Sequence, residues 1–170
     1  PRTKQISELL EEAAGLTDDA SLKKFLQLRS RAFLTDNYYE SDLAWMDLDG
    51  DLEVVIGPYE VYEDNLFNYK AAYEAFLCVV DKPASEKLAA ASRYLREMEA
   101  HLPIADEYKS SRGLASPIKV VQEILSAGDT KAGVQTTAFN LPNDERVRES
   151  KGSKKVMLKN VAQAKYEKCW

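Results

Sequence analysis

The stretch Leu52-Glu-Val-Val-Ile-Gly-Pro-Tyr-Glu-Val-Tyr62 decides the fold class of this chain. Its β-branched and aromatic residues favour a β-strand, whereas the residues before it have the apolar spacing of helices. Gly57-Pro58 predicts a kink within the strand, because proline has no N–H to donate to a neighbouring strand. We therefore expect an α+β fold, with N-terminal helices followed by a small mixed β-sheet packed with helices.

Upstream of this strand, apolar spacing and capping residues predict three helical segments. They are residues 4–14, a longer helix that runs from a cap at Asp18 or Asp19 to Leu34, and residues 37–47. Aspartate is a favoured N-cap because its carboxylate accepts hydrogen bonds from the unpaired N–H groups of the first helical turn.

Downstream of this strand, further strands and helices are expected. The apolar ending of residues 69–81 favours a second strand after a turn at residues 65–68, and two more strands are expected at residues 118–125 and 134–140. The remaining expected elements are a helix from Ala84 to His101 with Leu88, Ala91, Leu95, Met98 and Leu102 buried, a polar loop at 109–116, a turn-rich loop at 127–133, and a helix from Val156 to the end.

The length of 170 residues is that of one domain. We divide it into a helical lead-in, residues 1–50, and a mixed α/β core, residues 51–170. The chain starts at Pro1, and the last predicted helix runs into Cys169-Trp170 without a stop signal. We therefore expect a domain-sized piece of a longer protein.

Composition excludes several classes of protein. The net charge of −5 argues against a nucleic-acid-binding protein, and no apolar run approaches the roughly 18 residues of a membrane span. The two cysteines, Cys78 and Cys169, are far apart and form no Cys-x-x-Cys motif, which favours a reducing cytoplasm. We expect no nucleic-acid or membrane partner and a cytoplasmic location.

The chain has little catalytic equipment. His101 is the one histidine, and its place at a predicted helix end favours a structural role. No zinc cluster of Cys and His can be built, and no nucleophile elbow, P-loop or dinucleotide motif is present. The sequence by itself therefore predicts binding, with no catalytic residue, no metal ligand and no cofactor in this chain.

Residues 36–64 hold ten acidic side chains and no Lys or Arg. Most of them are expected to form a solvated acidic face. The eight Lys and Arg residues between Asp144 and Lys168 are likewise expected to form a solvated basic face. Glu60 is the best candidate for holding a cationic group, because it follows the Gly-Pro kink in an otherwise apolar strand, and a kink can turn a side chain into a cleft.

Asn140-Leu-Pro-Asn143 follows a predicted strand and suits the edge of a sheet, since Pro142 cannot donate to a ladder. An edge strand can take an extended peptide as an added strand, and the two amides could then hold the end of that peptide. A plain strand-end turn, which Asn and Pro also favour, is the alternative.

Several segments together carry a family resemblance. They occur in this order: Ile56-Gly-Pro-Tyr-Glu-Val-Tyr-Glu-Asp64, Phe67-Asn-Tyr-Lys-Ala-Ala-Tyr-Glu-Ala-Phe76, Ala127-Gly-Asp129, Asn140-Leu-Pro-Asn-Asp-Glu-Arg146 and Gly152-Ser-Lys-Lys-Val-Met-Leu-Lys-Asn160. Over about residues 36–170 the sequence resembles the dipeptidyl-peptidase III family of zinc metallopeptidases, in particular its bacterial and plant relatives, some of which are fused to Nudix (MutT-like) domains.

The resemblance implies two lobes around a cleft, one with a zinc-binding H-E-x-x-G-H-type helix and one with a β core whose edge strand binds the peptide. This sequence is similar to the stretch before the zinc helix, so zinc is expected in the parent protein. By position, the resemblance implies that Glu60 pairs with the free amine of the peptide and that Tyr62 hydrogen-bonds the peptide. It also implies that Asn140 and Asn143 contact the N-terminal end of the peptide.

The resemblance thus implies the substrate-binding portion of a zinc-dependent peptidase, a hydrolase, which is inactive without the zinc motif. Its partners would be a peptide substrate and the remainder of the parent chain. A non-catalytic module that binds a peptide or a partner protein is the alternative. A third hypothesis is a domain associated with a Nudix-type hydrolase, against which the missing Nudix box argues.

Overall fold

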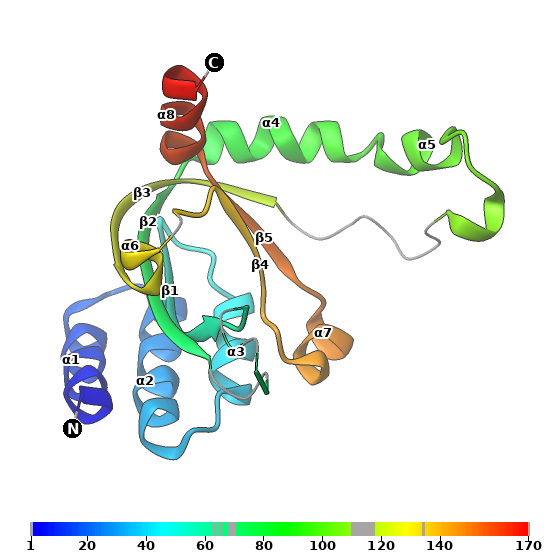
Figure 1. Ribbon diagram of the computed structural model, residues 1–170. Coiled ribbons are helices and arrows are strands. Elements are labelled where there is room, and N and C mark those ends of the chain that lie inside the picture. Colours follow the sequence, from blue (N-terminus) through cyan, green and yellow to red (C-terminus); the bar gives the residue numbers. More distant parts are fainter. Residues whose placement is uncertain are drawn as a thin grey trace.

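The computed structural model describes residues 2–62, 64, 66–67, 71–109, 118–133 and 135–169. Its described part contains one five-stranded sheet in the order β1-β2-β3-β5-β4 (Figure 1). The strands are β1 (Leu52–Glu60), β2 (Ala72–Val80), β3 (Ile118–Gly128), β4 (Ala138–Leu141) and β5 (Lys154–Leu158). All neighbours are antiparallel except β3 and β5, which are parallel, so the sheet is mixed and the predicted α+β class is confirmed.

Three helices precede the sheet, as predicted: α1 (Arg2–Leu16), α2 (Ala20–Thr35) and α3 (Tyr39–Met46). Asp19 caps α2, since its Oδ1 accepts hydrogen bonds from the backbone N–H groups of Ser21 at 2.8 Å and Leu22 at 3.0 Å. These hydrogen bonds stabilise the charged carboxylate and so lower the pKa of Asp19 below its usual value.

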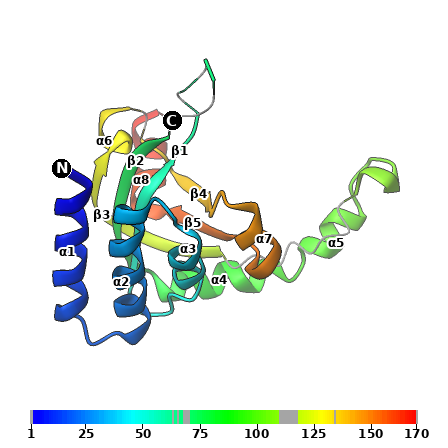
Figure 2. The same cartoon turned by 90° about the horizontal axis from the view of Figure 1, so that it is seen from below.

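The core lies between the helices and the sheet. Figures 1 and 2 show α1 and α2 side by side next to β1 and β2. Phe25 of α2, Trp45 of α3, Val55 of β1 and Phe76 of β2 are almost completely buried and belong to one apolar cluster. Burying these large side chains is the main contribution that attaches the helical segment to the strands.

Strand β1 is irregular where the sequence predicts a kink. Gly57 pairs with Glu74, but Glu60 pairs with Ala72, so β1 carries one more residue than β2 over this interval. Such a bulge bends the strand and changes the direction in which its side chains point. The prediction of a kink at Gly57-Pro58 is confirmed.

The helix predicted from Ala84 to His101 differs in the structure. It is two helices, α4 (Lys82–Ser92) and α5 (Leu95–Ala100), followed by the 3-10 helix η1 (Asp106–Tyr108), and Figure 1 shows them as an arm that leaves the sheet. The predicted buried face is wrong: α4 has no buried residue, and Met98 is 62% exposed. The reason is that the arm contacts the sheet at the start of α4, where Ser85 hydrogen-bonds the backbone of Val120 in β3, and then extends beyond the sheet.

The C-terminal part also differs from the prediction. The segment predicted as one helix from Val156 is strand β5 followed by α8 (Lys159–Cys169), because Val156 and Leu158 gain burial when β5 pairs with β3 and β4. The short helix α6 (Asp129–Ala132) lies within the loop predicted at 127–133, and the short helix α7 (Glu145–Lys151) was not predicted. The polar loop predicted at 109–116 lies outside the described residues except for Lys109. Of the turn predicted at 65–68, Leu66 and Phe67 are described and form a turn, and the other two positions lie outside the described residues. No helix in the described ranges is long and apolar enough to cross a membrane.

Candidate functional site

A cavity of about 390 Å³ lies where the bulged end of β1 faces β4 and α7. The four residues that the sequence and the resemblance selected, Glu60, Tyr62, Asn140 and Asn143, all line it. Residues that lie 80 positions apart in the chain are therefore neighbours in space. Their role in binding remains a prediction.

Strand β4, which lines this cavity, lies at an edge of the sheet. β4 is the last strand in the sheet order and pairs only with β5 among the described strands, so it is an edge strand, as the proline predicts. Beyond it, Asp144 caps α7 by accepting a hydrogen bond from the backbone N–H of Arg146 at 3.0 Å. The segment that carries Asn140 and Asn143 is thus held between an edge strand and a capped helix.

A hydrogen bond joins the two walls of the cavity. The side-chain Nδ2 of Asn143 donates to the backbone carbonyl oxygen of Tyr59 at 3.1 Å. The next residue, Glu60, accepts a hydrogen bond from the backbone N–H of Tyr62 at 2.7 Å, which fixes its carboxylate near the end of β1. Tyr62 itself is 82% exposed, so it can supply a phenol ring at the edge of the cavity.

Glu74 is a second carboxylate in this cavity, and the sequence analysis did not select it. Burial, with the nearby charges of Glu60 and Asp129, raises the pKa of Glu74 to about 7. A perturbed carboxylate in a cavity is a candidate functional residue. The available signal was an acidic residue within the apolar second strand, but its closeness to Glu60 depends on the pairing of β1 with β2.

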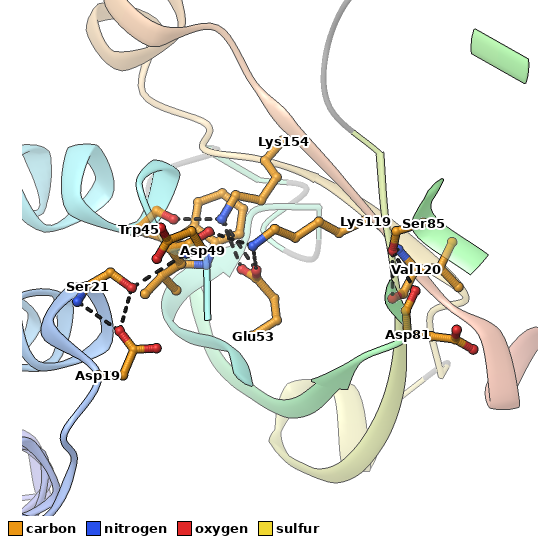
Figure 3. Close-up of polar contacts among 11 residues, drawn as sticks. Asp19, Ser21, Trp45, Asp49, Glu53, Asp81, Ser85, Lys119, Val120 and Lys154 are labelled. Carbon is orange, nitrogen blue, oxygen red and sulfur yellow. Dashed lines mark hydrogen bonds and ion pairs between the residues drawn. The ribbon is translucent and has the colours of Figure 1, made fainter. Parts of the chain in front are cut away.

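A second polar cluster lies away from this cavity, and Figure 3 shows it. Glu53 has no exposed surface, and its carboxylate lies 2.9 Å from Lys119 Nζ and 3.2 Å from Lys154 Nζ. Lys154 Nζ also donates to the carbonyl oxygen of Trp45 at 2.7 Å and lies 4.2 Å from the centre of that indole ring. Burial lowers the pKa of Lys154 to about 8.

This cluster corrects the expectation of solvated charged faces for some residues. Glu53 and Asp42 of the acidic stretch and Lys154 of the basic segment are all buried. Each is paired with an opposite charge from another element, which offsets the cost of removing it from water. The cluster at Glu53 therefore joins α3, β1, β3 and β5, and is a structural feature rather than a binding surface.

The described residues do not fit a zinc site. No group of three or more His, Cys, Asp and Glu side chains among them is arranged to hold a metal ion. His101 is exposed beyond α5, with its Nδ1 2.7 Å from the carbonyl oxygen of Glu97. The cavity instead presents the carboxylates of Glu60 and Glu74 and the amides of Asn140 and Asn143. Carboxylates can pair with an ammonium, and amides can hydrogen-bond a peptide backbone.

Known proteins resemble this chain in sequence and in fold. The family model for peptidase family M49 matches residues 1–169. A solved structure of DPP III from Caldithrix abyssi is similar to this chain with a TM-score of 0.91 and 64% identity, and covers 97% of this chain. A dipeptidyl-peptidase III structure from Corallococcus sp. strain EGB gives a TM-score of 0.83 and 51% identity, and covers 96% of this chain.

A curated relative is named Nudix hydrolase 3, from Arabidopsis thaliana, and is 48% identical over 98% of this chain. The chain spans only 22% of that protein and 32% and 31% of the two solved structures. Because the family model extends over nearly the whole sequence and the solved relatives share its fold at high identity, this chain belongs to peptidase family M49.

Proposed function

We propose that this chain is the portion of a zinc-dependent dipeptidyl peptidase that holds the free amino end of a peptide substrate, and that it does not catalyse hydrolysis alone. One observation carries the proposal: two carboxylates and two side-chain amides line a single cavity beside an edge strand. The names of the solved relatives, DPP III and dipeptidyl-peptidase III, support the class of substrate.

The chemistry of the cavity suits a peptide N-terminus. Glu60 and Glu74 supply negative charge for the terminal ammonium, and charge-assisted hydrogen bonds of this kind are the strong ones. The amides of Asn140 and Asn143 offer donors and acceptors to the first peptide groups. The edge of β4 offers free backbone groups, so an extended peptide can add as a further strand.

Hydrolysis of a peptide bond requires groups that activate water. The described residues hold neither a metal-binding group nor a histidine in the cavity. We therefore assign no step of hydrolysis to this chain and propose that the zinc site and the second lobe belong to other parts of a longer protein. The division into residues 1–50 and 51–170 and a cytoplasmic location, consistent with two free cysteines, form part of the same proposal.

The test compares a tetra-alanine peptide with its N-acetylated form by isothermal titration calorimetry. We expect the free-amine peptide to bind at least about tenfold more tightly, because a charged hydrogen-bonded contact contributes about 1.5–3 kcal/mol. Glu60→Gln should remove most of this preference. Glu86→Gln, on the exposed face of α4, is the matched control and should leave it intact.

Equal binding of the two peptides, or full retention of the preference in Glu60→Gln, would contradict the proposal. In a longer protein that contains this chain, the same substitution should lower kcat/KM for a dipeptidyl-arylamide.

A non-catalytic binding module is the second candidate, because a cavity lined by carboxylates and amides can hold the end of a peptide whether or not hydrolysis follows. It is distinguished by activity: EDTA-sensitive hydrolysis by the longer protein supports the peptidase, and peptide binding without hydrolysis supports the module. The Nudix name of the plant relative does not change this choice, because this chain matches 22% of that protein and resembles dipeptidyl-peptidase III structures there.

A further inference from the structure

A buried ion pair between α2 and α3 is joined to the cavity through Tyr59, which lines the cavity and hydrogen-bonds Asp42. We infer that Arg29, Asp42 and Tyr59 form a positioning network that sets the geometry of Glu60 and Asn143. On this inference α2 and α3, which contribute no residue to the cavity lining, determine how tightly it holds a ligand. The inference rests on the proposed function for its binding readout, and a second readout makes it testable without that function.

The network is centred on one carboxylate oxygen. Arg29 of α2 has no exposed surface, and its Nη2 lies 2.6 Å from Oδ1 of Asp42 in α3. The hydroxyl of Tyr59 in β1 donates to the same Oδ1 at 2.8 Å. Three elements that are separate in the sequence therefore meet at Asp42.

The guanidinium group of Arg29 is held on its faces by aromatic rings. Its Cζ lies 5.2 Å from the ring centres of Phe25 and Tyr38 and 5.5 Å from that of Tyr59. Its Nε and Nη1 have no hydrogen-bond partner within the described part of the chain. The charge of Arg29 therefore depends on Asp42 and on cation–π contacts, and the group cannot move without losing them.

Tyr59 transmits this constraint to the cavity. Its ring and hydroxyl are fixed by the network, while its backbone carbonyl oxygen accepts the hydrogen bond from Asn143 Nδ2 at 3.1 Å. Glu60 is the next residue along β1. A shift of the Tyr59 side chain thus moves the backbone that holds one cavity amide and precedes one cavity carboxylate.

The bulge in β1 is shaped around the same network. A Cβ atom at Gly57 would lie 2.9 Å from Arg29 Nη1 and 3.0 Å from Cε2 of Tyr59, closer than normal contact. Arg29 packs against aromatic rings and pairs with Asp42, and Tyr59 hydrogen-bonds Asp42, so neither side chain can move away easily. The absence of a side chain at position 57 therefore lets the strand bend against Arg29, and this bend directs Glu60 to the cavity.

A network that only stabilises the fold would not act on binding in the folded protein, so stability and binding must be separated. Tyr59→Phe removes only the hydroxyl and leaves the Arg29–Asp42 pair in place, so this variant should fold. Ser30→Ala is the matched control: Ser30 is buried in α2 beside Arg29, but its hydroxyl hydrogen-bonds Ser7 of α1 and not Arg29, Asp42 or Tyr59.

Two quantities are measured well below the unfolding temperature of each variant. The first is the dissociation constant of tetra-alanine with a free amine, and the second is the exchange rate of the Asn143 side-chain amide by NMR. We expect Tyr59→Phe to weaken binding and to accelerate exchange by about fivefold each, the effect of one lost hydrogen bond. Ser30→Ala should change neither, although it lowers the unfolding temperature.

Failure of the wild-type chain to bind the peptide would overturn the proposed function, and the Asn143 exchange rate alone would then decide on the network. Wild-type values of binding and exchange in Tyr59→Phe would overturn the inference. So would equal changes in Ser30→Ala, since these would reflect general loss of stability.

Discussion

Glu74→Gln should stabilise this protein, and more so at pH 8 than at pH 5. The partly buried Glu74 side chain lies near Glu60 and Asp129, and its pKa is raised to about 7 from the usual 4.5. Between these two values the native protein binds more protons than the unfolded chain. The free energy of unfolding therefore falls as the pH rises through this window.

The size of the effect follows from the pKa. At 1.36 kcal/mol per pKa unit, the penalty at pH 8 has an upper bound of about 3.4 kcal/mol. Glu74 is partly exposed, so solvent screening reduces this to about 1–2 kcal/mol. At pH 5, where the native side chain is protonated, the upper bound is about 0.8 kcal/mol, and the same screening reduces it to about 0.4 kcal/mol. Replacing Glu74 with Gln removes the charge and keeps the size of the side chain.

Thermal unfolding followed by circular dichroism at both pH values measures this difference. We expect Glu74→Gln to raise the unfolding temperature by about 4 °C at pH 8 and by much less at pH 5. Glu60→Gln is the companion variant: removal of its charge should lower the pKa of Glu74 and reduce the pH dependence, but burial should preserve part of it. A gain in Glu74→Gln that is equal at pH 5 and pH 8 would refute the reasoning.

Two further substitutions, each with a matched control, test a buried ion pair and a backbone conformation. Lys154→Met should lower the free energy of unfolding, measured in urea, by about 3 kcal/mol, because the fully buried Glu53 then keeps only Lys119 of its two lysine partners. Lys155→Met, one residue along β5, is the control and should lower it by less than about 1 kcal/mol. Equal losses in the two variants would contradict the pairing. Gly128→Ala should cost about 2–3 kcal/mol, since Gly128 has a φ of 77° and an added Cβ would lie 2.1 Å from the carbonyl oxygen of Tyr73. Gly15→Ala, with open space around it in α1, should instead stabilise by about 0.5 kcal/mol, and the reverse order of the two glycine variants would count against the described backbone.

Local patterns predicted the elements whose structure depends on neighbours along the chain. The cap at Asp19, the kink at Gly57-Pro58 and the edge position of the strand before Pro142 follow from hydrogen bonds that a residue can or cannot make locally. The ordered segments around Glu60 and Asn140 also indicated the correct family.

Elements that depend on packing were predicted less well. The spacing of Leu88 and Met98 predicted a buried face, but the arm formed by α4 and α5 leaves the sheet, so this face has little to pack against in the described structure. Val156 and Leu158 looked helical and instead form β5, because pairing with β3 and β4 buries both side chains. Apolar spacing shows that a face can be buried, but it does not identify what covers it.

The sequence by itself determined the α+β class, the family, and the four residues Glu60, Tyr62, Asn140 and Asn143, which the structure brings to one cavity. The tertiary structure alone revealed Glu74 beside Glu60, the Arg29–Asp42–Tyr59 network, and the burial of Glu53 with Lys154, 101 residues away in the chain. The physical reason is that the burial and pKa of a charged group depend on which distant charges and hydrogen-bond partners surround it, and only the folded chain brings these together.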